Sequence, residues 1–285
     1  ARTAVFRTPG LYTVTVSGTD PAAQLASVAR EVIVTNAADF DSFGSALLSP
    51  AWTPQAVEVR DSYSPLAWYS LEAVPGQLLL HIVDSAAQPL SHATPTFPAL
   101  WRPMPATADT ALVTEFDYES KRTGASFAGL VLDAQESGTT VRYAFGVEGG
   151  TTWRIKRSTG GAFTNLGAAT PFAGTEVVLR LRRAGATLHF ERRSEGVWLS
   201  VGSQPLPAES SLVRGGIFAS TSTAENVRFA FDYALVVDPQ NTNGQLNNVR
   251  LTELMYAPKE PDTAEWIELQ NVGTGPLSLL GVRFP

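Results

Sequence analysis

Residues 176–201 read EVVLRLRRAGATLHFERRSEGVWLSV, and this stretch decides the fold class. Three runs of alternating apolar and polar residues lie in it, at Glu176–Arg182, Thr187–Arg192 and Val197–Val201. Turn-forming residues separate the runs, first at Ala184-Gly185 and then at Ser194-Glu195-Gly196. A period of two residues is typical of half-buried β-strands, so the stretch predicts three strands joined by tight turns.

The same alternation continues through most of the chain. We expect further strands at Leu11–Val16, Glu31–Thr35, Gln77–Val83, Ala111–Tyr118, Ala128–Asp133, Val141–Val147, Thr152–Lys156, Gly215–Ser220 and Val227–Val237. The nearest candidate for an amphipathic helix, Asp20–Arg30, is too short to sustain the 3.6-residue period. Many short strands at a spacing of about 8–12 residues predict an all-β sandwich or jelly roll.

Composition excludes several kinds of function. The chain has 285 residues, a formal net charge of −6 and no cysteine. An acidic chain is a poor ligand for nucleic acid or anionic membranes, and the lack of cysteine excludes disulfides and thiolate chemistry. No run approaches the ~20 apolar residues of a membrane span, so we expect no membrane insertion. The first residues carry neither an initiator Met nor a signal peptide, and we expect an internal piece of a longer chain.

Two changes in composition predict the domain organisation. One lies at Thr35-Asn36-Ala37-Ala38, and the other is the polar stretch DPQNTNGQLNN at 238–248. We therefore expect a central domain that is preceded by a short piece and followed by a linker and a second short piece. Their bounds are 1–36, 37–238, 239–248 and 249–285.

The first piece resembles the end of a PKD domain, an Ig-like sandwich. The similarity is carried by Pro9-Gly10-Leu11-Tyr12-Thr13-Val14 and by Thr19-Asp20. The last piece resembles the beginning of a lamin-tail domain, which is also Ig-like. Its matching residues are Leu251–Pro258, Glu265–Asn271 and Leu277–Gly281. Both resemblances imply partial Ig-like modules of a large bacterial extracellular or cell-surface protein.

The central domain resembles the concanavalin A-like jelly rolls appended to secreted bacterial enzymes, such as the C-terminal domain of β-xylosidases. The matching stretches are Phe40–Phe43, Trp68–Leu71, Pro75–Leu80, Ala128–Leu132, Glu195–Trp198 and Gly215–Ser220. The resemblance implies a non-catalytic module that binds carbohydrate or spaces neighbouring domains of the same chain. It also implies a secreted or cell-surface location and no required cofactor.

One strand suggests catalysis instead. Glu115, Asp117 and Glu119 alternate along it, so their three carboxylates share one face. The spacing resembles the catalytic strand of laminarinase-like glycosidases, in which the first Glu is the nucleophile and the last Glu the acid/base. The alternative interpretation is an ordinary polar outer face, and we favour it because the other motifs of those enzymes are absent.

Aromatic residues are the better candidates for a glycan site, because sugars stack on Trp and Tyr rings. Trp52, Trp68 and Trp198 match Trp positions of the jelly-roll family, and this resemblance implies that they are core residues. The remaining candidates for an exposed platform are Trp101, Trp153, Tyr143 and Tyr63.

A structural Ca²⁺ is the metal hypothesis. Asp39 and Asp41 open the central domain and Asp232 lies in its last strand, so pairing of the first and last strands would bring these oxygen ligands together. The arginines around Arg180 and Arg182 form either an anion patch or an internally paired face, and Glu191 favours pairing.

Four functions remain open at this point: carbohydrate binding, domain spacing, glycoside hydrolysis at Glu115, and assembly of a surface filament or layer. Self-assembly would require the two partial end pieces to receive strands from a neighbouring chain.

Overall fold

The computed structural model describes residues 4–5, 10–19, 25–34, 40–59, 67–83, 87–92, 97–106, 109–118, 125–174, 176–194, 197–237, 249–255 and 266–271. The chain divides into two compact units, one of residues 40–237 and one of residues 1–39 with 238–285. All regular structure in the described residues is β. No helix in this part of the chain has the length and hydropathy needed to cross a membrane.

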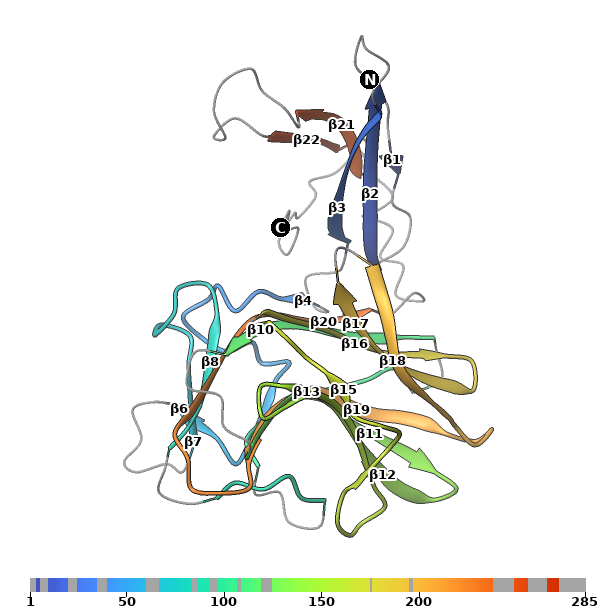
Figure 1. Cartoon of the computed structure of the whole chain (residues 1–285). Helices are drawn as coiled ribbons and strands as arrows, with labels where there is room; N and C mark the ends of the chain where they lie inside the picture. The colour runs from blue at the N-terminus through green and yellow to red at the C-terminus, as the bar shows by residue number, and fades with distance from the viewer. Residues whose placement is uncertain are drawn as a thin grey trace. The chain divides into compact units, whose positions relative to one another are not determined.

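The 40–237 unit is a sandwich of two sheets (Figure 1). The nine-stranded sheet, called the first sheet below, has the order β18 (Val197–Pro205), β17 (Thr187–Ser194), β16 (Glu176–Ala184), β10 (Ala111–Tyr118), β20 (Val227–Val237), β8 (Leu78–Ile82), β7 (Ala67–Ser70), β6 (Glu58–Val59), with β4 (Phe40–Asp41) beside β20. Its pairs are antiparallel except β6 with β7. The three strands that 176–201 predicts therefore form one end of this sheet.

The eight-stranded sheet, called the second sheet, lies against the first. Its order is β14 (Thr164–Asn165), β13 (Thr152–Ser158), β12 (Thr139–Glu148), β11 (Ser126–Glu136), β19 (Ser211–Thr221), β9 (Ala99–Pro103), β5 (Thr53–Gln55), with β15 (Thr170–Pro171) beside β13. All of its pairs are antiparallel. The predicted all-β sandwich is confirmed.

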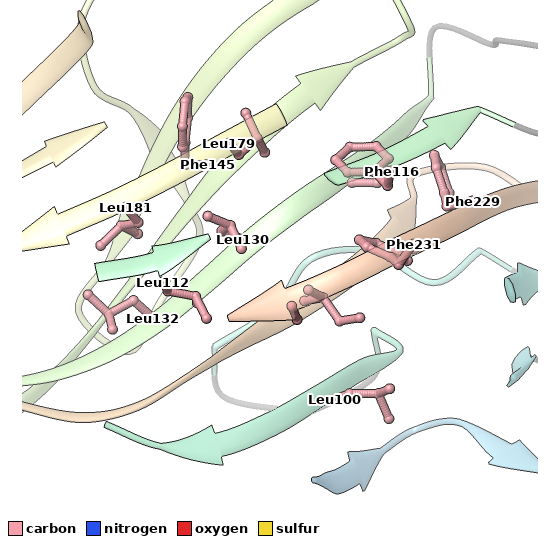
Figure 2. Close-up of a cluster of buried hydrophobic side chains, with 14 of the residues drawn as sticks. Leu100, Leu112, Phe116, Leu130, Leu132, Phe145, Leu179, Leu181, Phe229 and Phe231 are labelled. Carbon is pink, nitrogen blue, oxygen red and sulfur yellow. The ribbon is translucent and has the colours of Figure 1, made fainter. Parts of the chain in front are cut away.

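The core fills the space between the sheets with alternate residues of each strand. Phe116 lies 5.0 Å from Phe231 and 6.2 Å from Phe229 between ring centroids (Figure 2). From the second sheet, Leu130 and Phe145 join the same buried cluster. Each such side chain contributes about 1.5–3 kcal/mol when it leaves water, so this layer holds the two sheets together.

The unit that contains both chain ends has two small sheets of its own. In one sheet β1 (Ala4–Val5) pairs with β21 (Val249–Met255), which pairs with β22 (Trp266–Asn271). In the other, β2 (Gly10–Thr19) and β3 (Leu25–Val34) form an antiparallel pair. The end of the helix candidate Asp20–Arg30 thus lies in a strand. The PKD and lamin-tail resemblances of these pieces stay predictions.

Candidate functional site

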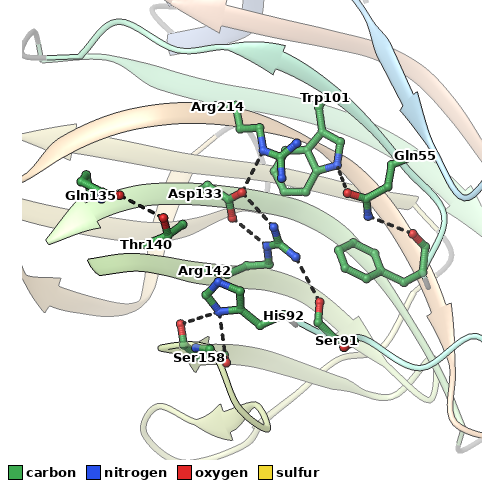
Figure 3. Close-up of polar contacts among 12 residues, drawn as sticks. Gln55, Ser91, His92, Trp101, Asp133, Gln135, Thr140, Arg142, Ser158 and Arg214 are labelled. Atoms are coloured by element: carbon green, nitrogen blue, oxygen red, sulfur yellow. Dashed lines mark hydrogen bonds and ion pairs between the residues drawn. The ribbon is translucent and has the colours of Figure 1, made fainter. Parts of the chain in front are cut away.

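An aspartate and two arginines form the centre of the outer face of the second sheet (Figure 3). Arg142 donates two hydrogen bonds to Asp133, from Nε at 2.6 Å and from Nη2 at 2.8 Å. Arg214 donates from Nε to the same carboxylate at 2.8 Å. Strand register explains the arrangement, since Asp133 on β11 lies opposite Arg142 on β12 and Arg214 on β19. The side chains of Asp133 and Arg142 are 3% and 4% exposed, so this is a buried ion pair.

Trp101 completes this Asp133–Arg142–Arg214 network. The guanidinium carbons of Arg214 and Arg142 lie 4.1 and 5.1 Å from the centroid of its ring. Its indole nitrogen donates to Gln55 Oε1 at 3.1 Å. Both distances lie within the range of a cation–π contact, which helps to hold the two guanidinium groups in place.

Residues 87–92, the covering segment, lie over part of this face. The backbone of Gln88 bridges to Thr221 of β19, and the carbonyl of Ser91 accepts a hydrogen bond from Arg142 at 3.0 Å. His92 contacts Ser158 of β13 at 3.2 Å. Leu90 packs against a second apolar cluster, which contains Phe97, Ala99, Trp101, Phe127, Val131, Ala144 and Phe218. The aromatic part of the outer face is therefore closed.

The other end of the same face is open. Arg214 lies there with a side chain that is 38% exposed. Thr140 is exposed and donates to Oε1 of the half-buried Gln135 at 3.0 Å. Pro103, which lies opposite Arg214 on β9, is exposed too. This open part offers one guanidinium and several groups that can bond to hydroxyls.

Three of the four aromatic platform candidates are buried, which corrects the expectation of an exposed platform. Trp101, Trp153 and Tyr143 are 1%, 3% and 0% exposed. Trp101 lies on the outer face beneath the guanidinium groups of Arg142 and Arg214, whereas Trp153 and Tyr143 point into the core between the sheets. The hydroxyl of Tyr143 donates to Glu136 at 2.5 Å. A buried ring cannot stack on a sugar. Tyr63 lies outside the described residues.

Trp198 differs from its expected core position. It lies on β18 with Arg180 above its ring, the guanidinium carbon 4.3 Å from the centroid, and it stays partly exposed. Arg180 and Arg182 both donate to Glu191, from Nε at 2.7 and 3.3 Å. Burial alone would raise the pKa of Glu191, but these two arginines lower it below its usual value. The predicted pairing within this face is confirmed. Trp52, in contrast, is buried as expected.

Glu115 and Asp117 lie on the outer face of the first sheet, while Phe116 between them points into the core. Burial, with Glu176 and Asp232 nearby, raises the pKa of Glu115 to about 7. Burial also raises the pKa of Asp117. Glu119 lies outside the described residues. The raised pKa values indicate that these two carboxylates are poorly solvated and lie close to other carboxylates. Whether they hydrolyse a glycan and whether they are buried are tested by different experiments.

A substitution at Glu115 tests that burial. Its pKa is higher in the folded chain than in the unfolded one, so its contribution to stability is present below pH 4.5 and is lost as the pH rises through 7. Glu115→Gln should therefore raise the free energy of unfolding by ~1–2 kcal/mol at pH 8, a value reduced for partial exposure, and change it little at pH 4.5. Urea unfolding at the two pH values measures this.

The exposed Glu209 provides the matched control. Glu209→Gln should leave stability unchanged at both pH values. Equal effects of the two substitutions would contradict the burial of the Glu115 carboxylate.

The described residues test only part of the Ca²⁺ hypothesis. The first and last strands of the domain do pair, with Asp41 opposite Ala234. The carboxylate of Asp41 accepts hydrogen bonds from the Phe43 amide and from Trp52 Nε1, both at 2.8 Å. Within the described ranges no group of three His, Asp or Glu side chains is placed to hold a metal ion. Asp39 lies outside them.

Comparison with known proteins gives a fold and no family. No family model matches the chain, and no curated protein matches it. Among solved structures, a xylan β-1,4-xylosidase from Bacillus halodurans matches with a TM-score of 0.54 and 18% identity, over 78% of this chain and 46% of that chain. The GH43 protein BlXynB from Bacillus licheniformis matches with a TM-score of 0.54 and 14% identity, over 80% and 51%.

A third structure, Bacteroides ovatus Xyloglucan PUL GH43B, matches with a TM-score of 0.51 and 16% identity, over 80% of this chain and 51% of that chain. This chain thus spans about half the length of the solved chains that it resembles. At these identities the likeness shows the β-sandwich fold.

Proposed function

We propose that the chain is a non-catalytic carbohydrate-binding module of a larger, secreted or cell-surface bacterial protein. The carboxylates on the outer face of the second sheet support the non-catalytic part, because they are held in salt bridges. Asp133 is shared by two arginines, and Glu148 pairs with Arg154 at 3.0 Å and with Lys156 at 2.5 Å. A glycosidase needs two carboxyl groups that can act as acid and base or nucleophile. Glu115 and Asp117 lie on the first sheet, and the hydrolysis assay below tests them.

The polar, open end of the same face supports the binding part of the proposal. Glycan sites combine an apolar or aromatic base with a few placed hydrogen-bonding groups. Arg214, Gln135 and Thr140 supply such hydrogen-bonding groups on this face, whereas the Trp101 ring beneath Arg214 is buried and cannot itself contact a sugar. The alternative non-catalytic function is domain spacing. It is favoured by the closed aromatic part of the face, because no ring among its described residues is exposed to stack on a sugar.

Binding and hydrolysis can be separated in one experiment. The whole chain is incubated with insoluble xylan, cellulose and mannan, and both the bound protein and the released reducing sugar are measured. We expect retention on xylan without release of sugar. Release that Glu115→Gln abolishes would contradict the non-catalytic role, whereas no retention on any polymer would leave domain spacing.

Trp198→Ala serves as the control in this experiment. Because Arg180 already lies over the Trp198 ring, the substitution should leave retention unchanged.

A further inference from the structure

The side chain of Arg214 is fixed by its contacts, while its two terminal nitrogens are available to a ligand. Its Nε donates to Asp133, its guanidinium carbon lies over the Trp101 ring, and its side chain reaches solvent. Within the described residues neither of its terminal nitrogens donates a hydrogen bond. Nη1 and Nη2 together form the end of the guanidinium fork, which matches the two oxygens of a carboxylate.

The charge of the network also favours an anion. One carboxylate, Asp133, serves the two guanidiniums of Arg142 and Arg214, which leaves one positive charge in excess. The excess lies at the exposed Arg214 rather than at the buried Arg142. In a chain of net charge −6, a fixed positive group on an open surface selects anionic ligands locally.

Two polar side chains on the same face favour a sugar acid as the anionic ligand. Gln135 and Thr140 lie on the next cross-strand row from Asp133 and Arg142, and their hydrogen bond orients the amide of Gln135. An amide and a hydroxyl side by side can both donate to and accept from the hydroxyls of a sugar, and a simple inorganic anion has no hydroxyl to donate to their oxygens.

Building on the proposed function, we propose that the open part of this face binds a uronic acid unit of a polysaccharide. The carboxylate would lie on Nη1 and Nη2 of Arg214, and the ring hydroxyls would bond to Gln135 and Thr140. The specificity of the module is then for acidic rather than neutral glycans.

Affinity electrophoresis of the whole chain tests the proposal with a matched pair of polymers. One gel contains glucuronoxylan and the other the same polymer with its carboxyl groups reduced to alcohols. We expect roughly tenfold tighter binding to the acidic polymer, weakening with salt, because a charge-assisted bidentate contact is lost in the reduced one.

The variants locate the contact. Arg214→Met should abolish the preference, and Arg214→Lys, which keeps the charge without the fork, should lose most of it. Arg182→Met is the matched control, since its side chain is 34% exposed and also bonds to one carboxylate, on the first sheet. Folding of each variant is checked by its melting temperature, and we expect it to be retained because Arg142 still donates two bonds to Asp133.

The possible failures are distinguishable. Equal binding of the acidic and reduced polymers would overturn the uronic acid inference and leave the proposed function standing. No binding to either polymer would overturn the uronic acid inference, and absence of retention on xylan, cellulose and mannan as well would overturn the proposed function. A preference that survives Arg214→Met and disappears in Arg182→Met would place the site on the first sheet instead.

Discussion

Replacing Asp133 by alanine is expected to reduce the free energy of unfolding by ~3–5 kcal/mol, one of the largest effects of any single substitution in the chain. The aspartate accepts three hydrogen bonds from Arg142 and Arg214. Without it, the buried Arg142 guanidinium loses both of its bonds to Asp133 and keeps only that to the Ser91 carbonyl. Urea-induced unfolding of the purified variant measures the loss.

The double substitution Asp133→Ala with Arg142→Met is the control. It shows whether the loss of stability comes from leaving the Arg142 charge buried without its partner. Removing both charges should restore part of the lost stability, because no unpaired guanidinium stays inside. A loss below ~1 kcal/mol for Asp133→Ala alone would show that water reaches the pair, and the outer face would then be less closed than described.

Gly146→Ala is expected to destabilise the second sheet by ~3 kcal/mol or more. A Cβ at this position would lie 1.8 Å from the carbonyl oxygen of Ala128, which is backbone and cannot rotate away. At its partner across β11 and β12, Gly129, a Cβ would lie 2.2 Å from the carbonyl oxygen of Phe145, and the φ there is +152°. The two strands would have to separate at the centre of the sheet.

Gly161→Ala is the matched control, because nothing lies within 4 Å of its Cβ position. It should change the free energy of unfolding by less than ~0.5 kcal/mol. If thermal unfolding gives the same melting temperature for Gly146→Ala and Gly161→Ala, the close approach of β11 and β12 is wrong.

Alternation in the sequence predicted most long strands of the sandwich. Ala111–Tyr118 and Val227–Val237 have the predicted bounds, and the remaining long strands differ mainly by a few residues at their ends. Such ends depend on how far a neighbouring strand extends, which is a tertiary property. The short strands β5, β6 and β9 were not predicted, because two to five residues carry too little periodicity.

The missed strand β9 explains the largest error about the site. Trp101 was a candidate for an exposed ring because the jelly-roll pattern assigned it no core position. In the structure β9 pairs with β19 and β5, and Arg142 and Arg214 lie over the Trp101 ring. Trp153 failed for a different reason: the turn before it leaves the inward or outward parity of β13 open, and only packing against Phe145 and Phe172 fixes it.

The Asp133–Arg142–Arg214 network could not be found from the sequence alone. Its three charged residues lie on three strands, and Arg214 is 81 positions from Asp133 in the chain. These three residues come into contact only through the order and register of the strands, and a local sequence pattern predicts neither. The one available signal was the presence of Asp133 and Arg142 in strands that otherwise read as apolar.

A crystal structure of the whole chain with a xylo-oligosaccharide that carries a glucuronic acid group tests the central claim most directly. The account predicts an intact oligosaccharide on the outer face of the second sheet, its carboxylate within hydrogen-bond distance of Nη1 and Nη2 of Arg214 and its hydroxyls near Gln135. An oligosaccharide bound on the first sheet, or cleaved beside Glu115, would contradict it.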